Sequence, residues 1–317
     1  MTWVKDGSLR YTIAAKPLEN GRSSASIRPS ETSFWTGFPM PVWTSDDALF
    51  SRRLGRRAVL AGCATVALTG WSLGARAAAP QPVPESDPRI AAEAVLVPGQ
   101  DHLRGYLARP KAPGKRPGLL FLHDERGLGA RARDIARRLA AEGFLVLALD
   151  CLSPSGGTPA DAKQAATALG RMPRDEALAR GHAGLEFLQG HAGCTGKVGA
   201  FGIGWGGTLA NEMAVQEPTL NGVVTYYGIQ PSFHLREEYA LMKSPLMQHY
   251  AGRDLATNVG IDPFEVELKE SNKGAAIFVY PAVERGFDDE SQPSTYDKEA
   301  ATLAWERSIA FLKKSTG

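Results

Sequence analysis

A glycine-rich segment at residues 202–207 (Gly-Ile-Gly-Trp-Gly-Gly) joins an apolar run, 198–203, to an amphipathic stretch, 205–217. A strand that turns sharply into a helix through glycines is typical of a nucleophile elbow, whose central residue projects above the sheet to attack an acyl carbon. Glycines are needed there because neighbouring backbones crowd the turn and strain its centre. The central residue here is Gly204, which carries no nucleophile.

The elements that must position this turn alternate along the chain from about residue 80. Short apolar runs predict strands at 94–97, 103–108, 118–123, 144–150, 198–203, 222–227, 245–250 and 275–280. Amphipathic stretches predict helices at 131–142, 160–170, 175–190, 205–217, 263–272 and 297–314. Strands that are apolar almost throughout are typical of a parallel sheet covered on both faces. We therefore predict an α/β fold, a mostly parallel doubly wound sheet of about eight strands, forming one domain over residues 80–317.

Further motifs agree with the elbow in order and spacing. They are Cys194-Thr-Gly-Lys-Val-Gly199, Leu209-Ala-Asn-Glu212, Tyr226-Tyr227-Gly228, His249-Tyr-Ala-Gly-Arg-Asp254, Tyr280-Pro281 and Leu303-Ala-Trp-Glu-Arg307. With them, the chain from about residue 90 to its end resembles the dienelactone hydrolase family of the α/β-hydrolase superfamily, and in particular its exported relatives. The resemblance implies an α/β-hydrolase fold and carboxylic ester or lactone hydrolysis.

The same resemblance implies that the catalytic triad is degenerate. The family's nucleophilic cysteine falls on Gly204, and its aspartate falls on Asp254, which is retained. Its histidine, from a His-Gly-Phe motif, falls on Arg285. The exported relatives have an accessory glutamate in a His-Glu-Asn-Arg-Gly motif; Asp124 takes that position here and Glu125 follows it.

Covalent acyl transfer needs a nucleophile and a base that activates it, and arginine cannot accept a proton. We therefore expect a non-catalytic member of the family, in which the backbone amides of Trp205 and Glu125 retain only an oxyanion hole. Arg285 either binds an acidic ligand or simply neutralises Asp254; neutralisation is the simpler interpretation.

The alternative is an active ester or lactone hydrolase with a rearranged site. Cys151 follows the strand at 144–150, on the correct edge of the sheet, although no motif places a histidine beside it. We expect Cys151, Trp205 and Tyr227 to line the pocket. Cys151 and Cys194 lie at opposite ends of their strands, so we expect both thiols to remain free.

Composition limits the partners. A formal net charge of +2 gives no indication of a nucleic-acid surface, and the six histidines and three cysteines do not cluster at metal-ligand spacings. We expect no cofactor and no metal. The expected partner is a small acidic, ester or lactone ligand.

The N-terminal region resembles an export signal. Arg56-Arg57 precedes a mildly apolar run, 58–75, that ends in the small residues of 75–80, which is typical of a twin-arginine signal. We expect residues 51–79 to be this signal, the mature protein to be periplasmic and the membrane to be met only during export. The alternative is that the apolar run 58–75 is not cleaved and anchors the protein in the membrane. Residues 1–50 are expected to be disordered, and translation starting at Met40 would give a normal signal.

Overall fold

The computed structural model describes residues 81–99, 102–229, 242–259, 261, 265–266 and 275–317. All of them belong to one of the two compact units into which the chain divides, Ser72–Gly317. The predictions for residues 1–50, Met40 and the signal at 51–79 lie outside the described residues, as does most of the helix predicted at 263–272. No helix within the described ranges is long and apolar enough to cross a membrane.

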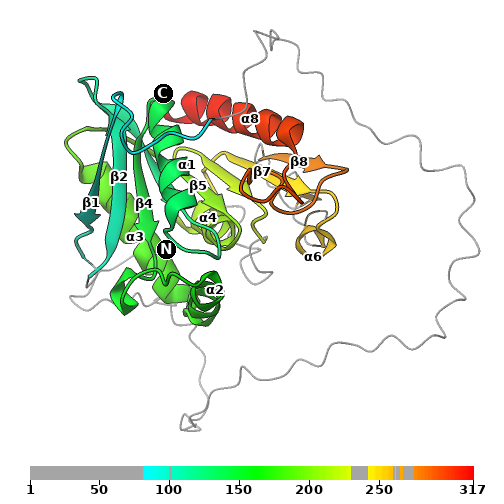
Figure 1. Cartoon of the computed structure of the whole chain (residues 1–317). Helices are drawn as coiled ribbons and strands as arrows, with labels where there is room; N and C mark the ends of the chain where they lie inside the picture. The colour runs from blue at the N-terminus through cyan, green and yellow to red at the C-terminus, as the bar shows by residue number, and fades with distance from the viewer. Residues whose placement is uncertain (1–80, 100–101, 230–241, 260, 262–264, 267–274) are drawn as a thin grey trace, which may run out of the picture. The chain divides into compact units, whose positions relative to one another are not determined.

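An eight-stranded sheet forms the centre of the described part of this unit (Figure 1). Its strands are β1 Ile90–Leu96, β2 Arg104–Pro110, β3 Arg116–Leu122, β4 Leu145–Asp150, β5 Cys194–Ile203, β6 Val223–Tyr226, β7 Leu246–Ala251 and β8 Ala275–Tyr280. Their order is β1-β2-β4-β3-β5-β6-β7-β8. β2 pairs antiparallel with β1 and β4, and the remaining pairs are parallel. The predicted mostly parallel sheet is confirmed.

Helices cover both faces of the sheet. They are α1 Ala130–Ala141, α2 Ala162–Arg171, α3 Arg174–Gly190, α4 Trp205–Gln216, α6 Leu255–Asn258 and α8 Lys298–Thr316, with the 3-10 turn η1 at Ser153–Ser155. α1 and α8 pack on one face and α2, α3 and α4 on the other, giving two apolar cores separated by the sheet. The four-residue helix α6 was not predicted, because it is too short to show a helical period.

The parallel register brings the site together at one edge. Leu122 of β3 pairs with Gly202 of β5, Ile203 with Tyr226 of β6, and Tyr226 with His249 of β7. The carboxyl ends of four neighbouring strands therefore meet, and the loops that follow them lie side by side. Ligands of open α/β sheets bind outside these ends.

The two described cysteines are both free and buried. They lie at opposite ends of β3 and therefore cannot pair. Cys194 is opposite Arg116, the first residue of β3, whereas Cys151 comes two residues after Leu149, which is opposite Leu122 at the other end.

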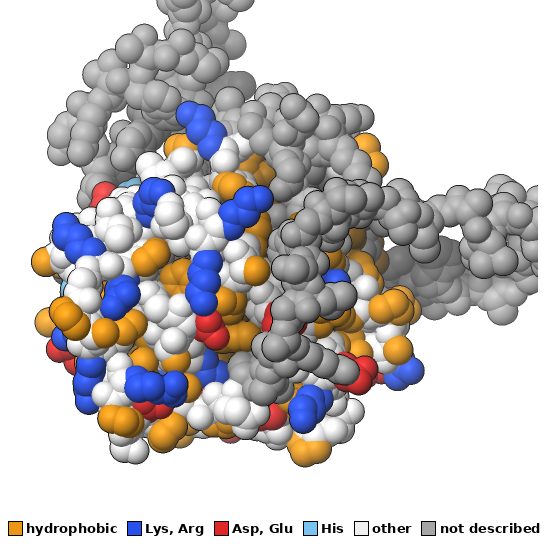
Figure 2. Space-filling model, turned by 90° about the horizontal axis from the view of Figure 1, so that it is seen from above, with side chains coloured by type: hydrophobic (Ala, Val, Ile, Leu, Met, Phe, Trp, Pro, Cys, Tyr) orange, Lys and Arg blue, Asp and Glu red, His pale blue; other side chains and the backbone are white. Residues whose placement is uncertain are grey.

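On the face shown in Figure 2, Lys and Arg side chains are scattered, with apolar and acidic side chains between them.

A fully buried histidine, His249 in β7, joins the sheet to α8. Its Nδ1 lies 3.0 Å from the Tyr280 hydroxyl and its Nε2 lies 3.0 Å from Ser308 Oγ. Ser308 donates its own proton to the Ala304 carbonyl, so Nε2 of His249 must donate to Ser308 and Nδ1 must accept from Tyr280. Burial, together with the charge of Arg307, lowers the pKa of His249 to about 3.

This histidine makes stability depend on pH. Its folded pKa is depressed, so the unfolded chain binds more protons than the native state below the ordinary histidine pKa of about 6.5, and stability falls as pH falls. We expect lowering the pH from 7 to 5 to cost about 2 kcal/mol through His249, because most carboxylates remain charged over this range in both states.

Urea unfolding at the two pH values measures this loss. In His249→Gln, which cannot be protonated, the pH-dependent loss should shrink by about 2 kcal/mol even if the variant is less stable at pH 7. An undiminished loss in the variant would show that other groups cause it.

Candidate active site

The turn at Gly204 has the backbone of a nucleophile elbow. β5 ends at Ile203, α4 begins at Trp205, and Gly204 between them has φ 56° and ψ −117°. The Gly206 N–H donates to the His123 carbonyl at 3.0 Å, which holds the end of β3 against the turn. A Cβ at Gly206 would collide with the carbonyl of Leu122, so the backbones do crowd the turn as the sequence predicts.

The space above Gly204 is filled by side chains from two other loops. A Cβ built on Gly204 would lie 2.6 Å from Oε2 and 2.9 Å from Oε1 of Glu125, and 3.0 Å from Nη2 of Arg285. Arg285 Nη2 donates to Glu125 Oε1. An ion pair therefore occupies the volume into which the side chain of an elbow nucleophile would project.

Arg285 is held from the opposite side by residues that follow β6 and β7. Its Nη1 lies 3.2 Å from the Tyr227 carbonyl, 3.3 Å from Thr257 Oγ1 and 3.4 Å from Asp254 Oδ2. Its guanidinium carbon lies 5.4 Å from the centroid of the Tyr227 ring. Asp254 also caps α6, its Oδ1 accepting the Thr257 N–H at 3.2 Å. The pairing of Arg285 with Asp254 matches the sequence interpretation, whereas its contact with Glu125 was not foreseen.

Comparison with known proteins identifies the family. A model of the dienelactone hydrolase family matches residues 103–316. The chain belongs to this family.

Its relatives match it over most of their length. A protein named "Putative carboxymethylenebutenolidase" from Salmonella typhi is 26% identical over 263 residues, covering 78% of this chain and 97% of that protein. One of the same name from Escherichia coli K12 is 27% identical over 273 residues, covering 80% and 98%. The crystal structure of the dienelactone hydrolase from Anabaena variabilis superposes with a TM-score of 0.57 at 21% identity, covering 72% of this chain and 100% of that one. The structural likeness confirms the α/β-hydrolase fold.

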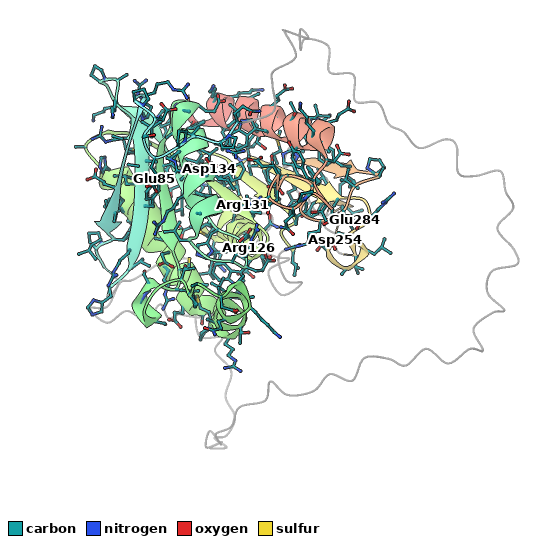
Figure 3. The ribbon with its side chains drawn as sticks, in the orientation of Figure 1. Glu85, Arg126, Arg131, Asp134, Asp254 and Glu284 are labelled. Carbon is teal, nitrogen blue, oxygen red and sulfur yellow. The ribbon has the colours of Figure 1, made fainter. Side chains whose placement is uncertain are left out.

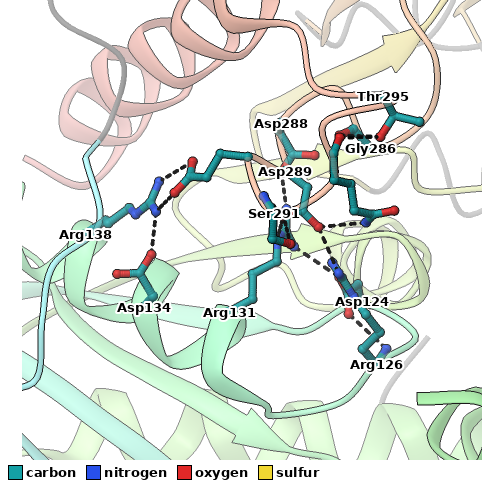
Figure 4. A network of polar contacts seen from close by, with 12 residues as sticks. Asp124, Arg126, Arg131, Asp134, Arg138, Gly286, Asp288, Asp289, Ser291 and Thr295 are labelled. Atoms are coloured by element: carbon teal, nitrogen blue, oxygen red, sulfur yellow. Dashed lines mark hydrogen bonds and ion pairs between the residues drawn. The ribbon is translucent and has the colours of Figure 1, made fainter. Parts of the chain in front are cut away.

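In this dienelactone hydrolase family member, Asp124 belongs to an ion-pair lattice beside the elbow (Figure 4). Asp124 Oδ2 accepts from Arg126 at 2.5 Å and from Arg131 at 3.1 Å. Arg131 also pairs with Asp288 at 2.6 Å and with Asp289 at 3.2 Å. Burial alone would raise the pKa of Asp124, but the hydrogen bond from Arg126 and the charge of Arg131 hold it below its ordinary value.

The carboxylate beside the elbow is therefore that of Glu125, and Asp124 supports the surrounding loops. Figure 3 shows Arg126 and Arg131 near the middle of the sheet, with Asp254 beside α6. Asp124, Gly204 and Arg285 still share a small recess of about 240 Å³, so the three positions do lie together. The sequence could have pointed to Glu125 only through its place directly after Asp124.

The two predicted oxyanion-hole amides lie on either side of the elbow. Trp205 is the first residue of α4, so its N–H has no acceptor within the helix. Glu125 follows the end of β3, which the Gly206–His123 hydrogen bond holds against the elbow. Whether these amides stabilise an oxyanion remains a prediction.

A larger cavity of about 430 Å³, here called the elbow cavity, opens beside Gly204. Its remaining lining residues are Glu125, Ala166, Leu169, Gly170, Met172, Arg174, Ala177, Trp205, Thr208, Leu209, Glu212, Tyr227, Ile229 and Arg285. Trp205 and Tyr227 therefore lie where the sequence places them. Among the described residues, no group of His, Cys, Asp and Glu side chains is arranged to hold a metal ion.

The prediction that Cys151 lines the pocket is wrong. Its side chain is fully buried in the apolar core under α2 and α3, and it borders neither the elbow cavity nor the recess. Burial, with the nearby charge of Asp150, raises the pKa of the Cys151 thiol to about 12, so the thiol stays protonated at neutral pH. A strand position alone does not reveal that the side chain at its end points into the core.

A buried histidine beside Cys151 was not singled out by sequence reasoning. His123 Nε2 accepts the Cys151 N–H at 3.4 Å, and Nδ1 lies 2.9 Å from the Asp124 carbonyl, so the proton is on Nδ1. Its ring stacks on Trp205 with centroids 5.9 Å apart. Burial lowers the pKa of His123, and only 1% of the residue is exposed. Neither member of this pair is accessible to a substrate.

Proposed function

We propose that this protein is a non-catalytic, exported member of the dienelactone hydrolase family, which binds a small ester, lactone or acid in the elbow cavity without hydrolysing it. One observation carries the proposal. The place of the nucleophile's side chain is taken by the ion pair of Glu125 with Arg285, above a residue that has no side chain.

The chemistry of these groups argues against turnover. Gly204 offers no nucleophile, and Arg285 remains protonated and cannot activate one. Backbone amides at the elbow would on their own leave about 10³–10⁴-fold acceleration over water, which is the residual found when a triad is removed from a hydrolase. Such a remnant is compatible with a binding protein.

The elbow cavity suits a small molecule. A volume of about 430 Å³ falls within the range of small-molecule sites. Leu169, Met172 and Leu209 supply apolar walls, and Trp205 and Tyr227 supply aromatic ones. Arg285 is already satisfied by Glu125 and Asp254, so it neutralises these carboxylates, and an acidic ligand must compete with Glu125 for it.

A binding measurement combined with a turnover measurement tests the proposal. The full chain is mixed with a dienelactone and, separately, with an activated phenyl ester, and NMR follows both ligand signals and products. We expect saturation transfer from protein to ligand, and product no faster than the roughly 10³–10⁴-fold residual that the elbow amides alone leave. Filling the cavity with Ala166→Phe should abolish the transfer. Product formation faster than this residual that is unchanged by substitution of Gly204 would instead establish an active hydrolase, and absence of transfer would remove the binding role.

Export is supported by the sequence alone, through Arg56-Arg57 and the apolar run that follows. The twin-arginine pathway carries folded proteins and reads the arginine pair. In a bacterium with this pathway, the natural chain should reach the periplasm shortened by a cut near residue 79. Replacing both arginines by lysine should leave it uncut in the cytoplasm. Fractionation and mass measurement decide the matter, and a full-length chain in the membrane fraction would indicate an anchor.

A further inference from the structure

A second cavity, here called the back cavity, lies between the sheet and the α1/α8 layer. It has a volume of about 440 Å³. Pro82, Val83 and Pro84 border it at the start of the described chain, and Ala301 and Trp305 border it from α8. The proposed function makes no use of it.

The floor of the back cavity is aromatic. Phe201 of β5 and Tyr226 of β6 line it, with ring centroids 5.4 Å apart. Trp305 of α8 meets Phe201 edge-on, with centroids 6.2 Å apart. Ile135 and Ile203 complete the apolar wall. Phe201 and Tyr226 are almost fully buried. The half-buried rings of Trp305 and Tyr296 therefore supply the exposed aromatic surface of the cavity. This surface favours a flat aromatic ligand, because offset and edge-to-face ring contacts add to the burial of apolar area.

The charged side chains around the back cavity are all paired with one another (Figure 4). Arg131 pairs with Asp288 and Asp289. Arg138 pairs with Asp134 at 2.6 Å and also with Glu290. The last lining charge, Arg137, lies 3.6 Å from Glu85 and 3.8 Å from Asp134. A charged ligand would have to break one of these pairs, so the cavity favours an uncharged molecule.

Two polar side-chain groups of the lining residues, the Trp305 indole N–H and the Tyr296 hydroxyl, have no hydrogen-bond partner within the described part of the chain. Both can donate to a ligand. An indole N–H can only donate. The complementary ligand therefore carries a hydrogen-bond acceptor such as a carbonyl or an ether oxygen.

The ion-pair lattice lies between the back cavity and the recess at Gly204, because Arg131, Asp288 and Asp289 line both. The elbow cavity and the back cavity share no lining residue, and each has its own tryptophan, Trp205 and Trp305. The two cavities are therefore separate sites.

We propose that the back cavity is a second ligand site, which takes an uncharged, flat aromatic molecule carrying a hydrogen-bond acceptor. This site does not depend on the proposed function of the elbow cavity. Its apolar walls supply the affinity, and the Trp305 N–H selects for the acceptor.

A neutral fluorescent probe tests this site. The probe is 6-propionyl-2-(dimethylamino)naphthalene, a flat ketone whose emission shifts to the blue in apolar surroundings. Titrated with the full natural chain, it should show a saturable blue shift. Ala301→Phe, which fills the back cavity, should weaken binding at least tenfold, whereas the matched filler of the elbow cavity, Ala166→Phe, should leave it unchanged. Circular dichroism checks the fold, and Ala301→Leu serves as a smaller filler should the first variant not fold.

Two further comparisons test the chemistry of recognition. Trp305→Phe should weaken the ketone about fivefold, as expected for one neutral hydrogen bond. It should leave competition by naphthalene, which has no acceptor, unchanged. The anionic 6-(dimethylamino)-2-naphthoate should bind at least tenfold more weakly than the ketone. Absence of a saturable shift, or a shift lost in Ala166→Phe and kept in the Ala301 variants, would overturn the proposal.

Discussion

Gly204→Cys combined with Arg285→His is expected to create ester and lactone hydrolysis at least about 100-fold above that of the natural protein, because it restores a nucleophile and a base. Asp254 lies 3.4 Å from Arg285, so a histidine at 285 has a carboxylate to orient it. The elbow backbone needs no change, since the turn from β5 to α4 is already formed at Gly204. Turnover of a dienelactone and an activated phenyl ester measures the gain.

Two further variants test the nucleophile alone and the space above the elbow. Gly204→Cys alone places its side chain against the Glu125–Arg285 pair and at a φ of 56°, so we expect no activity and a loss of about 1–3 kcal/mol in stability. Adding Glu125→Asn to the double variant frees the space above the elbow and should raise its rate further. A double variant that folds but stays inactive would show that the site has lost more than two residues.

Arg131→Met is expected to destabilise the protein by about 3 kcal/mol, because it leaves buried carboxylates without their common partner. Arg131 lies within 3.2 Å of Asp124, Asp288 and Asp289, and only 20% of its side chain is exposed. Burial alone would raise the pKa of Asp289, yet the charge of Arg131 and the hydrogen bonds from neighbouring side chains hold it well below its ordinary range.

Urea unfolding at pH 7 and pH 4 measures this effect, with Arg133→Met as the matched control. Arg133 is an exposed arginine on the same helix, 5.8 Å from the Tyr106 ring, so its loss should cost less than about 1 kcal/mol. The depressed carboxylate pKa means that the lattice stabilises the natural protein above the ordinary Asp pKa and less as pH falls. The difference between Arg131→Met and the natural chain should therefore shrink at pH 4. An equal loss of unfolding free energy in Arg131→Met and Arg133→Met would show that the ion pairs of Arg131 do not stabilise the protein.

Local pattern determined most of the fold. The apolar runs of the inner strands β4, β6 and β7 are buried on both faces, and an α/β alternation permits few other arrangements. The glycines of 202–207 predicted the elbow for a local reason as well, since any Cβ at Gly206 meets the Leu122 carbonyl. The identity of residues 204 and 285 already argued against the family chemistry.

Only the tertiary structure decided which side chains meet. Glu125 and Asp124 are neighbours in sequence, yet one reaches Arg285 above the elbow and the other joins Arg131 in the lattice, because successive residues of a loop point in different directions. Cys151 stands at the expected edge of the sheet, but its side chain turns into the core, where burial keeps it protonated. The back cavity is formed by residues up to about 220 positions apart, from Pro82 to Trp305, which no local pattern connects. Sequence periodicity sets which elements form, whereas the packing of loops and helices across the sheet sets where their charges, thiols and cavities lie.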